Sequence, residues 1–241
     1  MNKINVTVWN EYGDEQKEKS VADIYPNGLH VTIAGFLNKD GGINAKTALF
    51  FEPEHGLTDA VLDNTDVLIW WGHRYHDNLD DRIASRVVER VRRGMGIIFL
   101  HSAHKSKPFM LLLGTSGSLS WREAHERSRV WTCSPSHPIA KGVPEQFALD
   151  CEEMYGEPFG IPAPLQTVFI SWFQGGNVFR SGVTFQRDNG RIFYFQPGHE
   201  TYPSYHNEHV QRVITNAVKW ANPIVKAVSL DCPNVQPLEK I

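Results

Sequence analysis

The chain has 241 residues, and its 24 Lys and Arg against 27 Asp and Glu give a formal net charge of -3 at pH 7. This length suits one α/β domain with a substantial core, and the charge balance argues against binding to nucleic acid or to an anionic membrane. The three cysteines have no CxxC spacing, which argues against a disulfide framework or a thiolate metal site. Because no signal peptide and no apolar run of membrane-spanning length is visible, we expect a cytoplasmic protein.

The first half of the chain alternates between predicted strands and helices. Strands are predicted over residues 4–9, 47–51, 67–71 and 96–100. Helices are predicted over 15–24, 29–37, 57–62, from a cap at Asn78 or Asp80 to Arg93, and over 109–113. A strand is the alternative for 29–37, because that segment contains β-branched residues. The alternation implies right-handed parallel crossovers and therefore a three-layer, doubly wound, mostly parallel sheet of the flavodoxin-like kind.

The pattern changes after Gly114. Residues 121–131 are charged and irregular, and prolines punctuate the stretch that follows. Strands are predicted over 167–173, 178–186 and 191–195, with hairpin turn signals between them, so this half should extend the sheet with antiparallel strands. A last helix is predicted over 206–220. We expect a single domain over 1–222 and a tail over 223–241 that packs on the surface or on a partner subunit.

Three apolar strands are each followed within four residues by a histidine. The histidines that follow them are His73 and His76, His101 and His104, and His199. Ligands of open α/β sheets bind at the carboxyl ends of the strands, and imidazole is a common ligand of zinc. We therefore predict a divalent metal, with zinc as the first candidate, held by His73, His104 and His199, with Glu153 or His76 as fourth ligand. Glu11, Glu152 and Glu200 are alternative ligands. The competing interpretation is that these histidines hydrogen-bond the backbone and cap helices.

Ser102 lies where a strand turns into a helix, a position that exposes the nucleophile in many α/β enzymes. The flanking residues are Leu100 and His104, so the G-x-S-x-G pattern is absent. A nucleophilic Ser102 would need His104 or His199 as its base, and the alternative is a turn serine that satisfies backbone donors. For acid/base work we predict His101 and Glu11.

A dense charged and aromatic patch follows the glycine-rich segment. We predict that Trp121, Arg122 and Arg127 form a wall of the active cleft and contact a polyhydroxylated substrate, together with Glu200. The alternative is a solvated, salt-bridged face, because exposed ion pairs are common and contribute little.

Five segments carry a resemblance to a known family. They are Asp66–His73, Gly96–Ser102, His137–Ile139, Glu152–Tyr155 and Phe193–Glu200. In these segments the chain resembles the ThuA (trehalose-utilisation) family, whose fold is similar to that of the class I glutamine amidotransferases. The resemblance covers residues 4 to 221. It implies a role in the catabolism of disaccharides or related sugars, including 3-keto glycosides, and metal dependence in some members.

The amidotransferase likeness also bears on mechanism. Those enzymes use a cysteine at the elbow after the central strand and a histidine after a late strand, whose counterpart here is His199. The elbow position carries Ser102 or Ala103, so the resemblance implies that glutaminase activity is absent.

We therefore expect a homo-oligomeric, metal-dependent hydrolase, lyase or isomerase whose substrate is a small sugar. Two alternatives stay open. One is a metal-free hydrolase that uses Ser102 with His199, and the other is a non-catalytic sugar-binding or regulatory protein.

Overall fold

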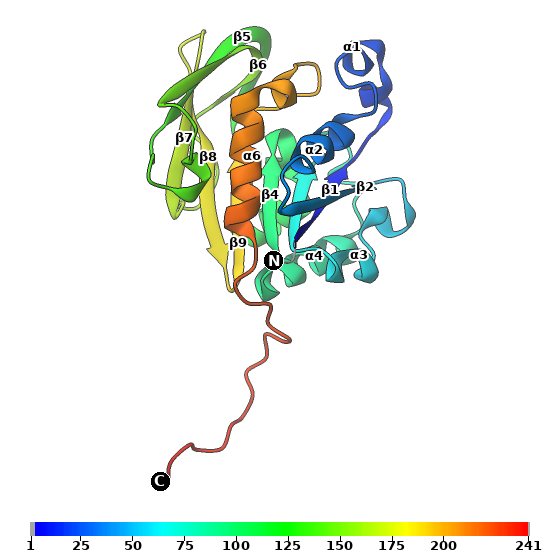
Figure 1. Ribbon diagram of the computed structural model, residues 1–241, viewed down its shortest axis with the longest axis vertical. Helices are drawn as coiled ribbons and strands as arrows, with labels where there is room; N and C mark the ends of the chain where they lie inside the picture. Colours follow the sequence, from blue (N-terminus) through cyan, green and yellow to red (C-terminus); the bar gives the residue numbers. More distant parts are fainter. Residues whose placement is uncertain (1–2, 241) are drawn as a thin grey trace.

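The computed structural model describes residues 3–240, and those before the C-terminal tail fold around one nine-stranded sheet (Figure 1). The strands lie in the order β2-β1-β3-β4-β9-β8-β7-β5-β6. The five strands from β2 to β9 run parallel, and β8, β7, β5 and β6 continue the sheet with antiparallel pairing. The expected parallel sheet with an antiparallel extension is thereby confirmed.

The strands are β1 (Ile4–Asn10), β2 (Ile43–Leu49), β3 (Val67–Trp71), β4 (Gly96–Leu100), β5 (Ser120–Thr132), β6 (Gln146–Gly156), β7 (Gln166–Phe173), β8 (Val178–Arg187) and β9 (Gly190–Phe195). The α-helices are α1 (Lys19–Ala22), α2 (Leu29–Leu37), α3 (Asp59–Asp63), α4 (Asp81–Arg93), α5 (Lys107–Leu113) and α6 (Glu208–Ala221). Short 3-10 helices are η1 (Asp14–Lys17), η2 (Pro53–Gly56), η3 (His101–Lys105), η4 (Pro138–Ala140) and η5 (Ser204–His206).

Two apolar cores lie on opposite faces of the sheet. Along β4, Ile98 and Leu100 pack with α2 and α6 on one face, whereas Ile97 and Phe99 pack with α3, α4 and α5 on the other. Every residue of β3 and β4 is buried, which explains their uninterrupted apolar sequences. The central strands are thus packed on both faces up to their carboxyl ends, where the polar residues begin.

Helix ends follow the sequence in most places. The side chain of Asp80 accepts a hydrogen bond from the backbone of Arg82 and caps α4, and Gly94 ends that helix with a φ of 134°. Asn207 caps α6 by accepting from His209 and Val210. Each cap orients a helix whose apolar side closes one face of the sheet.

Three expectations about the elements were wrong. The helix expected over 15–24 is two short helices, η1 and α1. The strand expected over 47–51 is β2, which begins at Ile43 and pairs with β1 from Ile4 onward. The irregular stretch over 121–131 is the long strand β5, and its partner β6 was not predicted. Most of the first half of β5 is exposed and its pairing is interrupted, so alternation between apolar and polar residues is lost.

The chain after α6 first packs against the body and then leaves it (Figure 1). The backbone N–H of Ala227 donates to the carbonyl of Arg93 at 2.7 Å, and Lys226 forms an ion pair with Asp66 at 2.7 Å. Beyond Ala227 nearly all described residues are exposed. Over residues 3–240, none of the helices has the length and apolar character needed to cross a bilayer.

Candidate metal and active site

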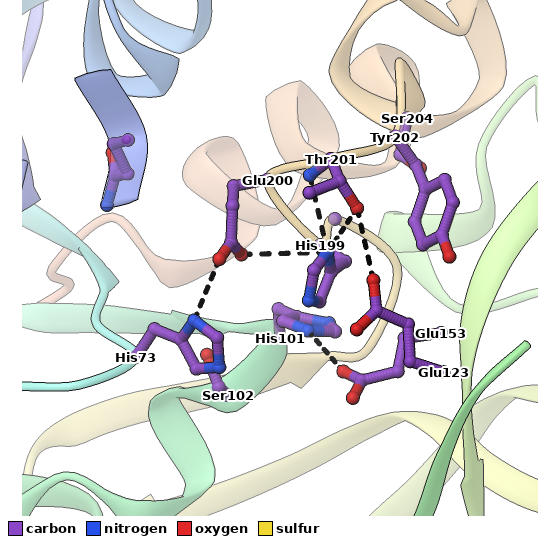
Figure 2. Close-up of polar contacts among 12 residues, drawn as sticks. His73, His101, Ser102, Glu123, Glu153, His199, Glu200, Thr201, Tyr202 and Ser204 are labelled. Carbon is purple, nitrogen blue, oxygen red and sulfur yellow. Dashed lines mark hydrogen bonds and ion pairs between the residues drawn. The ribbon is translucent and has the colours of Figure 1, made fainter. Parts of the chain in front are cut away.

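Three neighbouring strands deliver imidazoles to one edge of the sheet (Figure 2). His73 follows β3, His101 follows β4, and His199 follows β9. The ring centroids of His73 and His199 are 5.6 Å apart, and those of His101 and His199 are 5.3 Å apart. Because β3, β4 and β9 are adjacent and parallel, their carboxyl ends form a single edge, and the ring of His199 neighbours both other rings.

The first group of possible metal ligands is His73, His199 and Glu200. Nδ1 of His73 lies 2.9 Å from Oε1 of Glu200, and Nδ1 of His199 lies 3.7 Å from Oε2 of the same carboxylate. That Oε2 is buried and has no hydrogen-bond partner. Since a buried oxygen without a partner is costly, this atom marks the place where a further group would be stabilised.

The side chains of this group shift one another's pKa values and so set which of them are charged. Burial alone would raise the pKa of Glu200, but the hydrogen bond and charge of His73 hold it at about 2. Burial would likewise lower the pKa of His73, yet Glu200 raises it above its ordinary value. Burial, followed by the charge of His101, lowers the pKa of His199 to about 4. His199 is therefore a neutral imidazole at neutral pH, the form that binds metals.

The second group is His101, Glu153 and His199. Nε2 of His101 lies 2.9 Å from Oε2 of Glu153, and Nδ1 donates to the carbonyl of Gln196 at 2.9 Å. The hydroxyl of Tyr155 is 3.2 Å from the same Nε2. Burial opposes charge on His101, but the hydrogen bond and charge of Glu153 outweigh burial and raise its pKa. Burial would raise the pKa of Glu153, but the hydrogen bond and charge of His101 outweigh burial and lower it. The two side chains therefore form an ion pair.

The strained turn after β4 is occupied by His101, one residue earlier than we expected for the elbow. His101 has a φ of 50°, a left-handed conformation that is unfavourable for a residue with a side chain. Ser102, the next residue, donates from its hydroxyl to the carbonyl of Gly72 at 2.7 Å. The elbow thus presents an imidazole, and the serine hydroxyl is used to tie β4 to the loop after β3.

Glu11 positions the loop that carries His73. Its carboxylate accepts hydrogen bonds from the backbone N–H groups of His73, Arg74 and Tyr75 at 2.8, 2.8 and 3.1 Å. Its pKa is raised by burial, against these hydrogen bonds. A Cβ on Gly72 would lie 2.9 Å from Oε1 of Glu11, which explains the glycine. Glu11, which we predicted for acid/base work, is therefore engaged with the backbone of this loop.

Two further residues hold the site, and only the first of them, as an alternative ligand, was predicted from the sequence. Glu152 is fully buried and accepts from the backbone of Gly198 and His199 and from the hydroxyl of Ser204, at 2.9, 3.2 and 2.6 Å. The hydroxyl of Thr201 lies 2.8 Å from Nδ1 of His199. Acidic character made Glu152 an alternative metal ligand, whereas nothing in the sequence around Thr201 signals its contact.

His104 and His76 belong to neither group of possible ligands in the described part of the chain. Nδ1 of His104 donates to the carbonyl of Gly117 at 2.6 Å, and its ring packs edge-on against Tyr155, Phe159 and Tyr194. Burial lowers its pKa to about 3. His76 lies beside Glu11, with Nδ1 3.9 Å from Oε1. The structure therefore does not bring His104 together with His73 and His199, and Glu200 takes its place.

The predicted substrate residues of β5 divide into two kinds. Trp121 is 66% exposed. Nε of Arg122 donates to Glu126 at 2.6 Å and its guanidinium also donates to Asn177 at 3.1 Å. Arg127 is exposed. Arg122 thus holds the turn between β7 and β8, whereas the ring of Trp121 is exposed to solvent.

The parallel sheet with a strained turn after β4 and a histidine after β9 defines a class I glutamine amidotransferase-like fold. The chain belongs to the ThuA family, because the family model described as trehalose utilisation matches residues 5–221. A protein described as ThuA-like from Parabacteroides merdae superposes with a TM-score of 0.69 at 13% identity, covering 92% of this chain and 90% of that one.

Two other solved structures are similar. A second protein described as ThuA-like, from Bacteroides uniformis, gives a TM-score of 0.63 at 15% identity over 91% of each chain. A glutamine amidotransferase from Thermotoga maritima gives 0.56 at 9% identity, over 92% of this chain and 99% of that one. No curated protein sequence matches the chain. At such low identities, these superpositions establish the shared fold alone.

Proposed function

We propose that this ThuA family member is an enzyme of sugar utilisation that acts on a small carbohydrate with a divalent ion, zinc foremost, bound by His73, His199 and Glu200. The observation that supports the proposal is the buried Oε2 of Glu200, which has no hydrogen-bond partner and lies beside two imidazoles. Two histidines and one glutamate are a ligand set of catalytic zinc sites, in which a fourth position stays open for water or substrate.

The protonation states and spacing fit such an ion. The donor atoms of two ligands, each about 2 Å from a tetrahedral zinc, are about 3.3 Å apart. This spacing is close to the 2.9 Å between Nδ1 of His73 and Oε1 of Glu200. Glu200 is ionised and His199 is neutral at neutral pH, and His73 would release its proton on binding. The hydroxyl and the backbone N–H of Thr201 lie 2.8 and 3.3 Å from Nδ1 of His199 and fix the orientation of its ring.

The remaining residues supply proton transfer. A bound divalent ion contributes Lewis-acid chemistry toward a sugar oxygen or a water molecule. His101 holds a proton at Nε2 against Glu153, and its Nδ1–H is fixed by Gln196. Both ring nitrogens of His101 are engaged, so in this proposal the carboxylate of Glu153 exchanges the proton with the substrate and His101 holds it in reserve.

We also propose that the protein lacks glutaminase activity. The strained elbow carries His101, and a thiolate is needed there for the amidotransferase chemistry. Cys133 and Cys232 are exposed and distant from His101 in sequence, and Cys151 is a half-buried residue of β6. The imidazole at the elbow supports proton transfer in place of a covalent thioester.

The test is zinc binding by the full chain without a histidine tag. We expect about one zinc per chain, and we expect His199→Ala and Glu200→Gln to weaken zinc affinity by about 100-fold or more. His209→Ala is the matched control, because His209 lies on α6. Turnover of trehalose and its 3-keto derivative should be lost in chelator. Full turnover in chelator, with no stoichiometric ion, would rule the proposal out.

A further inference from the structure

An interruption of β5 lies directly opposite a residue of the site. Arg122 pairs with Met154 and Glu126 pairs with Glu152. Three residues of β5 therefore oppose only Glu153, the carboxylate that forms an ion pair with His101. Two of the three residues Glu123, Ala124 and His125 are therefore extra, and this segment must bulge out of the ladder. Bulges of this kind re-aim side chains and are frequent beside active sites.

The bulge residues reach the ligand His199 through its neighbours. Oε1 of Glu123 lies 3.5 Å from the hydroxyl of Thr201, which is itself 2.8 Å from Nδ1 of His199. The ring of His125 is 5.5 Å from that of Tyr202, and Tyr202 is 5.4 Å from His199. His125 has a φ of 51°. A non-glycine residue held in this conformation indicates a backbone constrained by its surroundings.

An exposed aromatic ring precedes the bulge on the same face of the sheet. Trp121 pairs with Tyr155, and the side chains of directly paired residues point to the same face. Tyr155 reaches His101 on that face, so Trp121 lies on the side of the site. Its ring is 66% exposed, although tryptophan is among the most costly side chains to leave in water.

The side chains at the inner site leave little room by comparison. His101, His199, Glu153 and Glu200 are all buried, and the side chain of His73 is only 27% exposed. A substrate larger than one sugar ring must therefore extend outward. The exposed residues Trp121, Glu123 and His125, which we call the β5 rim, lie at this boundary.

We propose that the β5 rim binds the second sugar ring of a disaccharide whose first ring reacts at His73, His199 and Glu200. The indole of Trp121 covers the apolar C–H face of that ring. The carboxylate of Glu123 accepts hydrogen bonds from its hydroxyls, and the imidazole of His125 offers a donor or an acceptor. This subsite rests on the proposed function, because it needs the first ring at the inner site.

The experiment compares trehalose with glucose in calorimetric titrations of the full chain. We expect the wild-type chain to bind trehalose at least about tenfold more tightly than glucose. Trp121→Ala should raise the Kd for trehalose about tenfold and leave the Kd for glucose within about twofold. Glu123→Gln should raise the Kd for trehalose about threefold. His125→Gly should do the same, because it keeps the positive φ and removes only the imidazole.

Matched controls are Trp131→Ala, which removes another exposed tryptophan of β5, and Glu145→Gln, which neutralises an exposed glutamate before β6. Neither should change the trehalose affinity. The subsite is refuted if Trp121→Ala binds trehalose as the wild-type chain does, if the wild-type chain binds the two sugars equally, or if it binds no trehalose.

Zinc content measured on the same samples separates this proposal from the proposed function. If zinc binds normally but the preference for trehalose does not depend on Trp121, the β5 rim proposal is refuted and the metal site is not. A preference that depends on Trp121 in a chain that binds no zinc supports the rim and sinks the metal site.

Discussion

Nε2 of His101 and Oε2 of Glu153 lie 2.9 Å apart, with side-chain exposures of 0% and 7%. The pair joins the strained turn after β4 to β6, the outermost strand of the antiparallel extension. Removing one member of a buried ion pair leaves the other charge without compensation. The two halves of the sheet are therefore linked at the site by a contact that substitution of either residue would disturb.

Glu153→Gln should lower turnover about 100-fold, because His101 loses the carboxylate that orients it and stabilises its charge. Zinc affinity should stay within about threefold of the wild-type value, since Glu153 is absent from the group of His73, His199 and Glu200. Steady-state kinetics and zinc titration measure the two effects. Loss of zinc from Glu153→Gln with full zinc in Glu200→Gln would place the ion in the group of His101 instead.

His104→Ala should destabilise the fold by about 2–4 kcal/mol, because it leaves a cavity among Tyr155, Phe159 and Tyr194 and an acceptor at Gly117 without its donor. Zinc affinity should not change. Denaturant unfolding and zinc titration are the measurements. His104→Asn keeps a donor near Nδ1 and should recover part of the stability, whereas a fall in zinc affinity with either variant would restore His104 as a ligand.

Ser102→Ala should leave turnover within about threefold and cost about 1 kcal/mol of stability, because its hydroxyl is engaged with the carbonyl of Gly72. Kinetics on trehalose and its 3-keto derivative, with thermal unfolding in parallel, test both statements. A drop in turnover of more than 100-fold with an intact fold would support the metal-free hydrolase, in which Ser102 attacks with His199 as base.

The Glu157–Arg180 pair should make stability depend on pH. Burial alone would raise the pKa of Glu157, but the hydrogen bonds from Arg180 and from the backbone outweigh it and lower the pKa. A lowered pKa in the folded state means that the pair stabilises the fold above the unfolded pKa of about 4.3 and that this contribution disappears as the pH falls through the folded pKa.

Because both side chains are 30% exposed, the contribution is modest, about 1 kcal/mol. Thermal unfolding of the wild-type chain and of Glu157→Gln from pH 7 to pH 3 is the measurement. The gap between their Tm values should be largest at pH 7 and narrow toward pH 3. A gap that is constant over this range would contradict the assignment.

The central strands and the edge that carries the site could be predicted from the sequence. Strands β3 and β4 are buried on both faces, and such strands need continuous apolar residues. Histidines directly after them must then lie at the carboxyl edge. The strand after residue 190 ends in the same way, which explains why His199 could be placed beside His73.

The choice among the histidines of η3 could not be predicted. His101 and His104 both follow β4, yet only His101 adopts a left-handed conformation and reaches Glu153, whereas His104 points into an aromatic cluster. That difference depends on a strained turn, whose conformation is set by tertiary contacts. Strand β5 escaped prediction for a related reason, because its bulge interrupts the period of two on which strand prediction depends.

The position of β9 between β4 and β8 has a consequence for folding. His101 and His199 follow adjacent strands, although all of β5, β6, β7 and β8 separates them along the chain. Non-local pairing of this kind is slow, because a long loop must close before its contacts form. During refolding, helical signal from α4 should therefore return before zinc affinity, and the appearance of zinc affinity should report the moment at which β9 inserts.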